Sequence, residues 1–224
     1  MEKSKSLQTK IYEIAIRRNS TITAYFKFVY ALIILVLALG GYFTFVNHPL
    51  GRTFYQVGVN FGRAALVLLA IVVLPGILGR FQIEIPITRI IILFRRQLGI
   101  TVFLLAFTHY QLVRGLLFYS KQMPFILPRP LFEFFGFWAL TFLFLMFLTS
   151  NNFSVKKLGK WWKRLHRIVY LVLWLLVLHT GLQRISIWTY LIGIFAVLEI
   201  VSFFYSYLVS SRQRSSQTPE AKSS

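Results

Sequence analysis

Two histidines in one apolar stretch carry the clearest chemical signal in this sequence. His166 stands just before the uncharged run 168–183, and His179 lies inside it. A neutral imidazole is a good iron ligand, and a bilayer is a costly place to leave one unpaired. At 1.5 Å per residue, the two positions lie roughly 20 Å apart along a helix. That separation suits one haem iron near each face of a membrane; hydrogen bonding of both rings to neighbours is the alternative.

A third histidine, His109, lies at a position that matches His179. His109 is 12 residues beyond Gln97, and His179 is 15 residues beyond Arg164, where the basic residues end. If both segments cross the membrane outward, both rings lie roughly 18–22 Å from the inner edge. Two axial ligands of one haem need such a common depth, so His109 and His179 are the candidate pair.

The inner histidine has no such partner. Residues Arg95 and Arg96 stand where a ligand facing His166 would be, and guanidinium groups do not ligate iron. A spacing of 13 also turns an ideal helix by roughly 220° beyond whole turns, so His166 and His179 do not share one face, and a bulge, a bend or different haem azimuths are needed. His48, beside a proline in a loop, is interpreted as an exposed turn residue.

The elements that position these histidines must be membrane helices. The chain has 224 residues, is 57% hydrophobic and 17% aromatic, and contains no cysteine. This composition is more apolar than that of soluble domains, and the lack of cysteine excludes disulfides and iron–sulfur clusters. The net charge of +19 first suggests nucleic acid. However, the basic residues lie between apolar segments, which is typical of a membrane protein with no nucleic-acid partner.

Six segments are long enough to cross a bilayer, and they cover roughly 26–46, 57–78, 97–119, 131–148, 168–183 and 187–209. Nineteen Lys and Arg residues lie on the side of the termini and six on the other, which predicts cytoplasmic termini. The sequence therefore predicts an all-α integral protein of the plasma (inner) membrane, a multi-pass six-transmembrane-helix bundle. A basic N-terminal segment (1–25) precedes the helical domain (26–209), and a disordered cytoplasmic tail (210–224) follows it.

Several charged and aromatic residues are candidates for accessory roles. Arg63, Arg96 and Arg114 are candidate partners for haem propionates, with snorkelling to the headgroups as the alternative. Glu199, near the middle of the sixth segment, is expensive there if ionised, and protonation, an arginine partner and a proton or quinol site all stay open. The tryptophans near 161–162 and 188 are interpreted as interface belts.

The sequence resembles a known family in three stretches, RRQLGITVFLLAFTHYQL (95–112), LTSNNFSVKKLGKWWKRLHRIVYLVLWLLVLH (148–179) and GRAALVLLAIVVLP (62–75). These resemble the ferric-reductase-like transmembrane domain, and within it the MsrQ branch of haem-binding subunits of periplasmic methionine sulfoxide reductase systems. The resemblance covers about residues 50–180. It implies a six-helix b-type cytochrome in which His109, His166 and His179 are the haem histidines. NADPH oxidases and eukaryotic ferric reductases have a further ligand on the third helix that this chain lacks.

The expected function is that of an electron-transfer subunit with haem b, one or two per chain, and FMN as a further candidate cofactor. About 15 residues follow the sixth segment, too few for a flavin–nicotinamide domain. A cytoplasmic flavin reductase or a quinone is therefore the expected donor, and a soluble or peripheral protein on the outer side the acceptor. The alternatives are a metal-ion (ferric) reductase working with a separate flavoprotein, and a non-redox transporter or assembly factor whose histidines only form hydrogen bonds.

Overall fold

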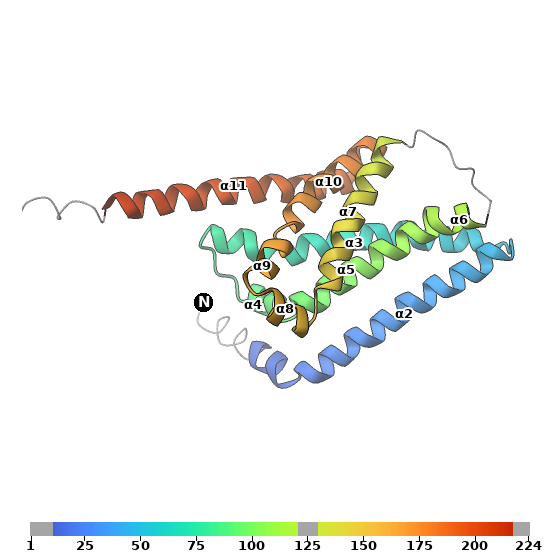
Figure 1. Ribbon diagram of the computed structural model, residues 1–224, viewed down its shortest axis with the longest axis horizontal. Helices are drawn as coiled ribbons and strands as arrows, with labels where there is room; N and C mark the ends of the chain where they lie inside the picture. The colour runs from blue at the N-terminus through green and yellow to red at the C-terminus, as the bar shows by residue number, and fades with distance from the viewer. Residues whose placement is uncertain (1–10, 121–129, 217–224) are drawn as a thin grey trace, which may run out of the picture.

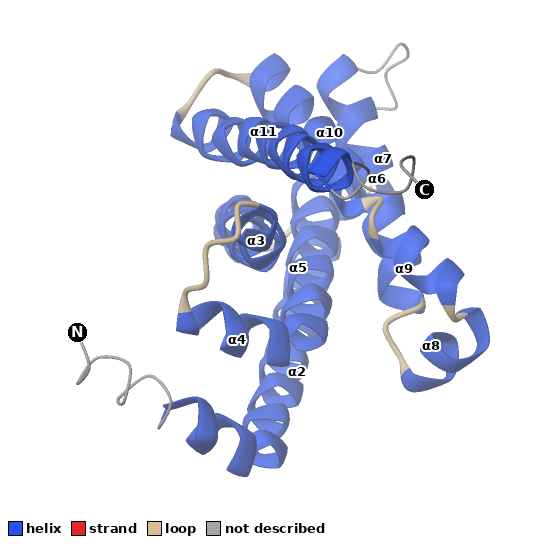
Figure 2. Ribbon diagram, turned by 90° about the vertical axis from the view of Figure 1, so that its left-hand side faces the viewer, coloured by secondary structure: helices blue, strands red, loops and turns tan. Residues whose placement is uncertain are grey.

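The fold is a bundle of helices, seen in a computed structural model that describes residues 11–120 and 130–216 (Figures 1 and 2). No β-strand occurs within those ranges. Six helical spans are long and apolar enough to cross a membrane, and they cover Asn19–Phe45, Leu50–Arg80, Arg95–Phe118, Leu131–Leu148, Lys160–Gln183 and Ile187–Arg212. This confirms the predicted all-α bundle of six spans. Helices are the expected form because their backbone groups are satisfied without water.

Four spans are single helices: α2 (Asn19–Phe45), α3 (Leu50–Arg80), α7 (Leu131–Leu148) and α11 (Ile187–Ser216). The third span joins α5 (Arg95–Tyr110) to α6 (Leu116–Tyr119) through the π-helical turn η1 (Gln111–Gly115). The fifth span consists of α9 (Lys160–His166) and α10 (Val169–Gln183), and the short helices α4 (Pro86–Leu93) and α8 (Asn152–Leu158) lie in the connections. His109 and His166 therefore lie at or next to the end of a regular α-helix inside their spans, whereas His179 lies within α10.

Local sequence signals explain where the connecting helices begin and end. Pro86 occupies the first turn of α4, where a missing N–H costs nothing. The side chain of Asn151 accepts a hydrogen bond of 2.8 Å from the backbone N–H of Ser154 and caps the start of α8. Gly159, at φ +50°, separates α8 from α9 in a conformation that favours glycine.

The fifth span is broken between its two histidines. The helix α9 ends at His166, residues Arg167 and Ile168 form a turn, and α10 begins at Val169. His166 and His179 therefore lie on two helices. The break supplies the bend that their 13-residue spacing requires.

The boundaries of two other elements also differ from prediction. The helix α3 begins at Leu50, so residues 50–56 of the predicted connection between the first two spans are already helical. The helix α11 continues to Ser216, so residues 210–216 are helical where the sequence predicts a disordered tail; the rest of that tail lies outside the described residues. In Figure 1, α11 projects well beyond the other helices.

The core of the bundle lies between α3, α5, α7, α10 and α11, and the buried residues of α7 include Ala139 and Leu143. Its fully buried side chains include one each from α3, α5, α10 and α11, namely Val73, Val102, Leu173 and Ile192. In contrast, only 6% of the most apolar window of α2 is buried, and α2 runs along the edge of the bundle in Figure 1. An apolar helix with so little protein contact is expected to face lipid.

Candidate functional site

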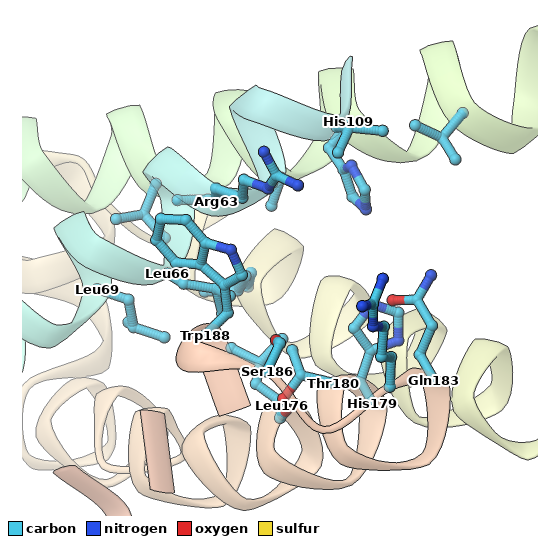
Figure 3. A pocket seen from close by; sticks show the side chains of 18 of the residues that line it. Arg63, Leu66, Leu69, His109, Leu176, His179, Thr180, Gln183, Ser186 and Trp188 are labelled. Atoms are coloured by element: carbon cyan, nitrogen blue, oxygen red, sulfur yellow. Dashed lines mark hydrogen bonds between the residues drawn. The ribbon is translucent and has the colours of Figure 1, made fainter. Parts of the chain in front are cut away.

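A cavity of about 570 Å³ lies between α3, α5 and α10, and it is closed on one side by the start of α11. Its volume is within the range of about 300–1,000 Å³ that holds small ligands and cofactors. His109 on α5 and His179 on α10 both line it. Figure 3 shows the two imidazoles projecting from opposite walls toward the space between them. The structure thus brings together the two histidines whose depths match in the sequence. We refer to this space as the outer cavity.

Backbone carbonyls orient both imidazoles. The Nδ1 atom of His109 lies 2.9 Å from the carbonyl oxygen of Gly58 on α3. The Nδ1 atom of His179 lies 2.7 Å from the carbonyl oxygen of Phe132 on α7. A carbonyl oxygen can only accept, so each Nδ1 carries the hydrogen and donates it, which leaves the lone pair of a neutral ring on Nε2. Metal-bound histidines are commonly held in this way.

The rim of the outer cavity is polar and basic. Arg63 lines the cavity, donates a hydrogen bond of 3.2 Å to the Oδ1 atom of Asn60, and lies 5.7 Å from the centre of the Trp188 ring. Three further polar residues at this rim are Gln183, Arg184 and Ser186. Arg63 therefore lies at the cavity that contains the histidine pair, where a partner for haem propionates would be needed. Arg184 and Trp188 are lining residues that sequence reasoning missed, although the position of Arg184 directly after α10 was a usable signal.

Arg114 has a different environment from Arg63. It lies in η1 and forms an ion pair with Glu133 in the first turn of α7. It is not one of the residues that line the outer cavity. Its pairing joins the third span to the fourth, next to the Phe132 carbonyl that holds His179.

A second cavity, of about 700 Å³, lies at the other end of the bundle and is lined by α3, α4, α5, α7, α9 and the start of α10. His166 lines this inner cavity, and it is the one histidine among its described lining residues. Its ring stacks on Trp162 with centroids 4.1 Å apart, and its Nε2 atom lies 3.2 Å from the Oγ1 atom of Thr149. Four basic residues also line this cavity, namely Arg95, Arg96, Lys163 and Arg167.

The contacts of Arg96 and Trp162 refine two predictions. Arg96 lines the inner cavity and donates a hydrogen bond of 2.6 Å to the Oδ1 atom of Asn152. Trp162 does not act only as part of an interface belt, because its Nε1 donates to the carbonyl of Thr149 at 2.9 Å while its ring supports His166. Trp161, in contrast, is 67% exposed, as an interface residue should be.

The two cavities share part of their walls. The three apolar side chains that line both are Leu69 on α3, Val102 on α5 and Leu143 on α7. The cavity that holds His109 and His179 is thus separated from the cavity that holds His166 by a thin apolar partition. The two cavities follow one another along α5, which lines the outer cavity with His109 and the inner cavity with Arg95 and Arg96.

A buried polar cluster lies beside the inner cavity. Arg80 donates from Nε to the Oγ atom of Ser202 at 2.8 Å and from Nη1 to the hydroxyl of Tyr170 at 2.9 Å. Ser202 in turn donates to the backbone carbonyl of Glu199, whose side chain is buried. Tyr170 lines the inner cavity, so the cluster links that cavity to the middle of α11. Within the described residues, this cluster is not part of any group of three or more His, Cys, Asp or Glu side chains that could hold a metal ion.

The fourth histidine, His48, lies in the turn between α2 and α3. It is exposed, accepts a hydrogen bond of 3.2 Å from the backbone N–H of Leu50, and lies against Phe43. It lines neither cavity. This placement agrees with its interpretation as a loop residue.

Comparison with known proteins identifies relatives of a segment that contains the lining residues of the inner cavity and part of those of the outer cavity. The profile of the family described as ferric reductase like transmembrane component matches residues 61–177. A protein-methionine-sulfoxide reductase heme-binding subunit MsrQ of Agrobacterium fabrum is 41% identical over 101 residues, covering 43% of this chain and 46% of that protein. The protein of the same name from Brucella ovis is 39% identical over 83 residues, covering 36% of this chain and 37% of that protein. These matches therefore span less than half of either relative. No solved structure matches the chain significantly.

Proposed function

The chain belongs to the family of ferric reductase like transmembrane components, and we propose that it is a b-type cytochrome subunit that carries electrons across a membrane. The observation that carries this proposal is the pair His109 and His179, which face one cavity from opposite walls with Nδ1 engaged and Nε2 free to bind. The relatives, named as haem-binding subunits, support the same reading.

The residues of the outer cavity fit a haem. Two imidazoles on different helices would hold the iron, and the apolar walls formed by residues such as Leu66 and Val102 suit a flat hydrophobic ring. Arg63 and Arg184 at the rim are cations suited to propionates. Bound haem b supplies a one-electron couple inside the bilayer.

The inner cavity is proposed to hold the group that receives electrons from the donor. Its single histidine, His166, and its four basic residues suit either a second haem with a different second ligand or FMN held by its phosphate. The shared partition of Leu69, Val102 and Leu143 keeps the two groups close and dry. The task of these side chains is to exclude water while adding little thickness between the sites.

Orientation and partners complete the proposal. The charge asymmetry of the connections supports cytoplasmic termini in the plasma (inner) membrane, with the His109–His179 pair toward the outer side. The donor is a cytoplasmic flavin reductase or a quinol. The acceptor outside is a methionine sulfoxide reductase, as the names of the relatives support. The family description favours ferric iron as the second candidate acceptor.

The transfer of electrons can be tested in lipid vesicles that contain the purified protein. Vesicles are loaded with ferricyanide, and dithionite, which crosses bilayers slowly, is added outside. Wild-type protein should consume the internal ferricyanide faster than empty vesicles do. The variants His109→Ala and His179→Ala should fall to the rate of empty vesicles, because each removes one of the two facing imidazoles.

The matched control is His48→Ala, because His48 is exposed and lines neither cavity. It should retain the wild-type rate and the wild-type absorption spectrum. Histidine variants that transfer electrons as well as wild type would refute the proposal, and so would purified protein without a b-type spectrum. Comparing re-oxidation by ferric citrate with re-oxidation by a methionine sulfoxide reductase and a sulfoxide substrate then identifies the acceptor.

A further inference from the structure

Each imidazole of the outer cavity packs flat against a glycine of the neighbouring helix. A Cβ atom at Gly62 on α3 would lie 2.7 Å from the Nδ1 atom of His109, and one at Gly136 on α7 would lie 2.6 Å from the Nδ1 atom of His179. In both cases the three nearest heavy atoms to the added carbon belong to that imidazole. Real Cβ atoms do not tolerate separations this short. Any larger residue would therefore push the ring away from its position.

The two glycines share one register with the carbonyls that hold the histidines. Gly62 follows the Gly58 carbonyl by four residues, and Gly136 follows the Phe132 carbonyl by four residues. In an α-helix, the carbonyl of a residue points toward the residue four positions later, whose Cβ stands beside it. Without that Cβ, an imidazole can reach the carbonyl from the side. The same arrangement occurs on two different helices and serves two different histidines.

We infer that Gly62 and Gly136 are positioning residues that set where the two axial imidazoles stand. This inference rests on the proposed function, because it concerns the ligands of a bound haem. The missing Cβ atoms let Nδ1 donate to the carbonyl, and that bond directs Nε2 into the cavity. A glycine at each position thus acts on the haem through the histidine.

Close packing of helices is the competing explanation for a glycine in a membrane span. Gly58 is an example, because a Cβ there would meet Leu112 and Val113 of η1. Gly62 and Gly136 differ because their nearest neighbours are the ligand rings. Alanine is a better helix former than glycine, so replacing a glycine that has open space around it should not weaken the helix. Gly79 and Gly193 have nothing within 4 Å of an added Cβ, and both lie inside helices.

The experiment titrates haem-free protein with hemin and records the absorption spectrum of each complex. The variants Gly62→Ala and Gly136→Ala should bind hemin about 10–100-fold more weakly, the usual loss when the support of a metal ligand is removed. Their low-spin spectrum should be replaced in part by a high-spin spectrum, because one imidazole no longer reaches the iron. The controls Gly79→Ala and Gly193→Ala should keep wild-type affinity and a fully low-spin spectrum.

A second measurement separates the ring contact from general damage to the fold. In haem-free protein, Gly62→Ala should lower the midpoint of thermal unfolding, but the same change should have no such effect in a His109→Gly background. The pair Gly136→Ala and His179→Gly should behave in the same way. A cost that persists without the ring would overturn the inference, as would Gly62→Ala protein with normal affinity and spectrum. If wild-type protein bound no haem, the proposed function would fail, while this haem-free cycle would still decide whether each glycine acts through its histidine.

Discussion

The Nε2 atom of His166 lies 3.2 Å from the Oγ1 atom of Thr149, which reverses the arrangement seen at the other two cavity histidines. The Thr149 hydroxyl already donates to the carbonyl of Leu145 at 2.9 Å, so it accepts from His166. His166 therefore carries its hydrogen on Nε2, whereas His109 and His179 carry theirs on Nδ1. His166 must therefore break its hydrogen bond to Thr149 before it can bind a metal through Nε2. Otherwise its role differs from that of His109 and His179.

This difference predicts that the two cavities respond separately to substitution. His166→Ala should leave the low-spin spectrum of the outer haem intact, because neither His109 nor His179 contacts Thr149 or His166. Reduction by the cytoplasmic donor should slow at least about tenfold, the lower end of the loss seen when a metal ligand's surroundings are disrupted. The measurements are haem and FMN content per chain and the rate of haem reduction.

The content measurement identifies the inner group. Loss of one haem per chain would assign a second haem to the inner cavity, and loss of FMN would assign a flavin. The variant Thr149→Val keeps the His166 imidazole but removes its hydrogen-bond acceptor. It therefore tests the orientation of the imidazole separately from its presence. Unchanged cofactor content together with an unchanged rate in His166→Ala would contradict a redox role for the inner cavity.

The polar cluster beside the inner cavity predicts a cost in stability. In Tyr170→Phe, the hydroxyl that accepts from Arg80 is lost while the ring that contacts Phe203 remains. Arg80 already has one buried guanidinium nitrogen, Nη2, without a hydrogen-bond partner. Leaving a second one unpaired should lower the free energy of unfolding by about 1–3 kcal/mol. Thermal unfolding in detergent measures this.

The control for that prediction is Tyr190→Phe, which removes a hydroxyl from a ring that is 64% exposed. It should change the unfolding midpoint little. Equal effects of Tyr170→Phe and Tyr190→Phe would show that the Arg80 contact contributes nothing to stability.

The ion pair between Arg114 and Glu133 predicts an effect on the outer haem. Glu133→Gln removes a negative charge next to the residue whose carbonyl holds His179, so it should raise the midpoint potential of the haem. It should also destabilise the protein by about 1–3 kcal/mol, between the values for exposed and buried pairs. Redox titration and thermal unfolding give the two values.

A double variant tests whether the two residues act as a pair. Combining Glu133→Gln with Arg114→Ala should cost less than the sum of the single changes. Strict additivity would mean that the pair is not coupled. An unchanged midpoint potential would place the charge too far from the haem to matter.

Much of the fold could be predicted because membrane spans have a strong compositional signal. The apolar lengths predict six helices, and the matching depths of His109 and His179 predict that they meet. The 13-residue spacing indicates a bend, but its position after His166 could not be predicted, because no proline or glycine marks residues 167–168. The stacking of His166 on Trp162, one turn earlier on the same helix, is a local contact at this break.

Sequence reasoning missed those residues of the candidate site whose types are common in membrane proteins for general structural reasons. Trp188 fits an interface belt by composition, yet it lines the outer cavity beside Arg63. Gly62 and Gly136 fit close helix packing, which is common in membranes, and only the positions of the imidazoles assign them another role. The sequence also gives no signal for the η1 turn just after His109, although such turns occur often at functional sites.

Rescue by free imidazole tests the central claim most directly, namely that His109 and His179 supply the two axial nitrogens of one haem. In His109→Gly and in His179→Gly the ring is removed but the carbonyl of Gly58 or Phe132 remains. Each variant should lose the low-spin spectrum, and millimolar imidazole should restore it by occupying the space that the ring has left. His48→Gly should need no rescue. Retention of the low-spin spectrum in either cavity variant without imidazole would contradict the account.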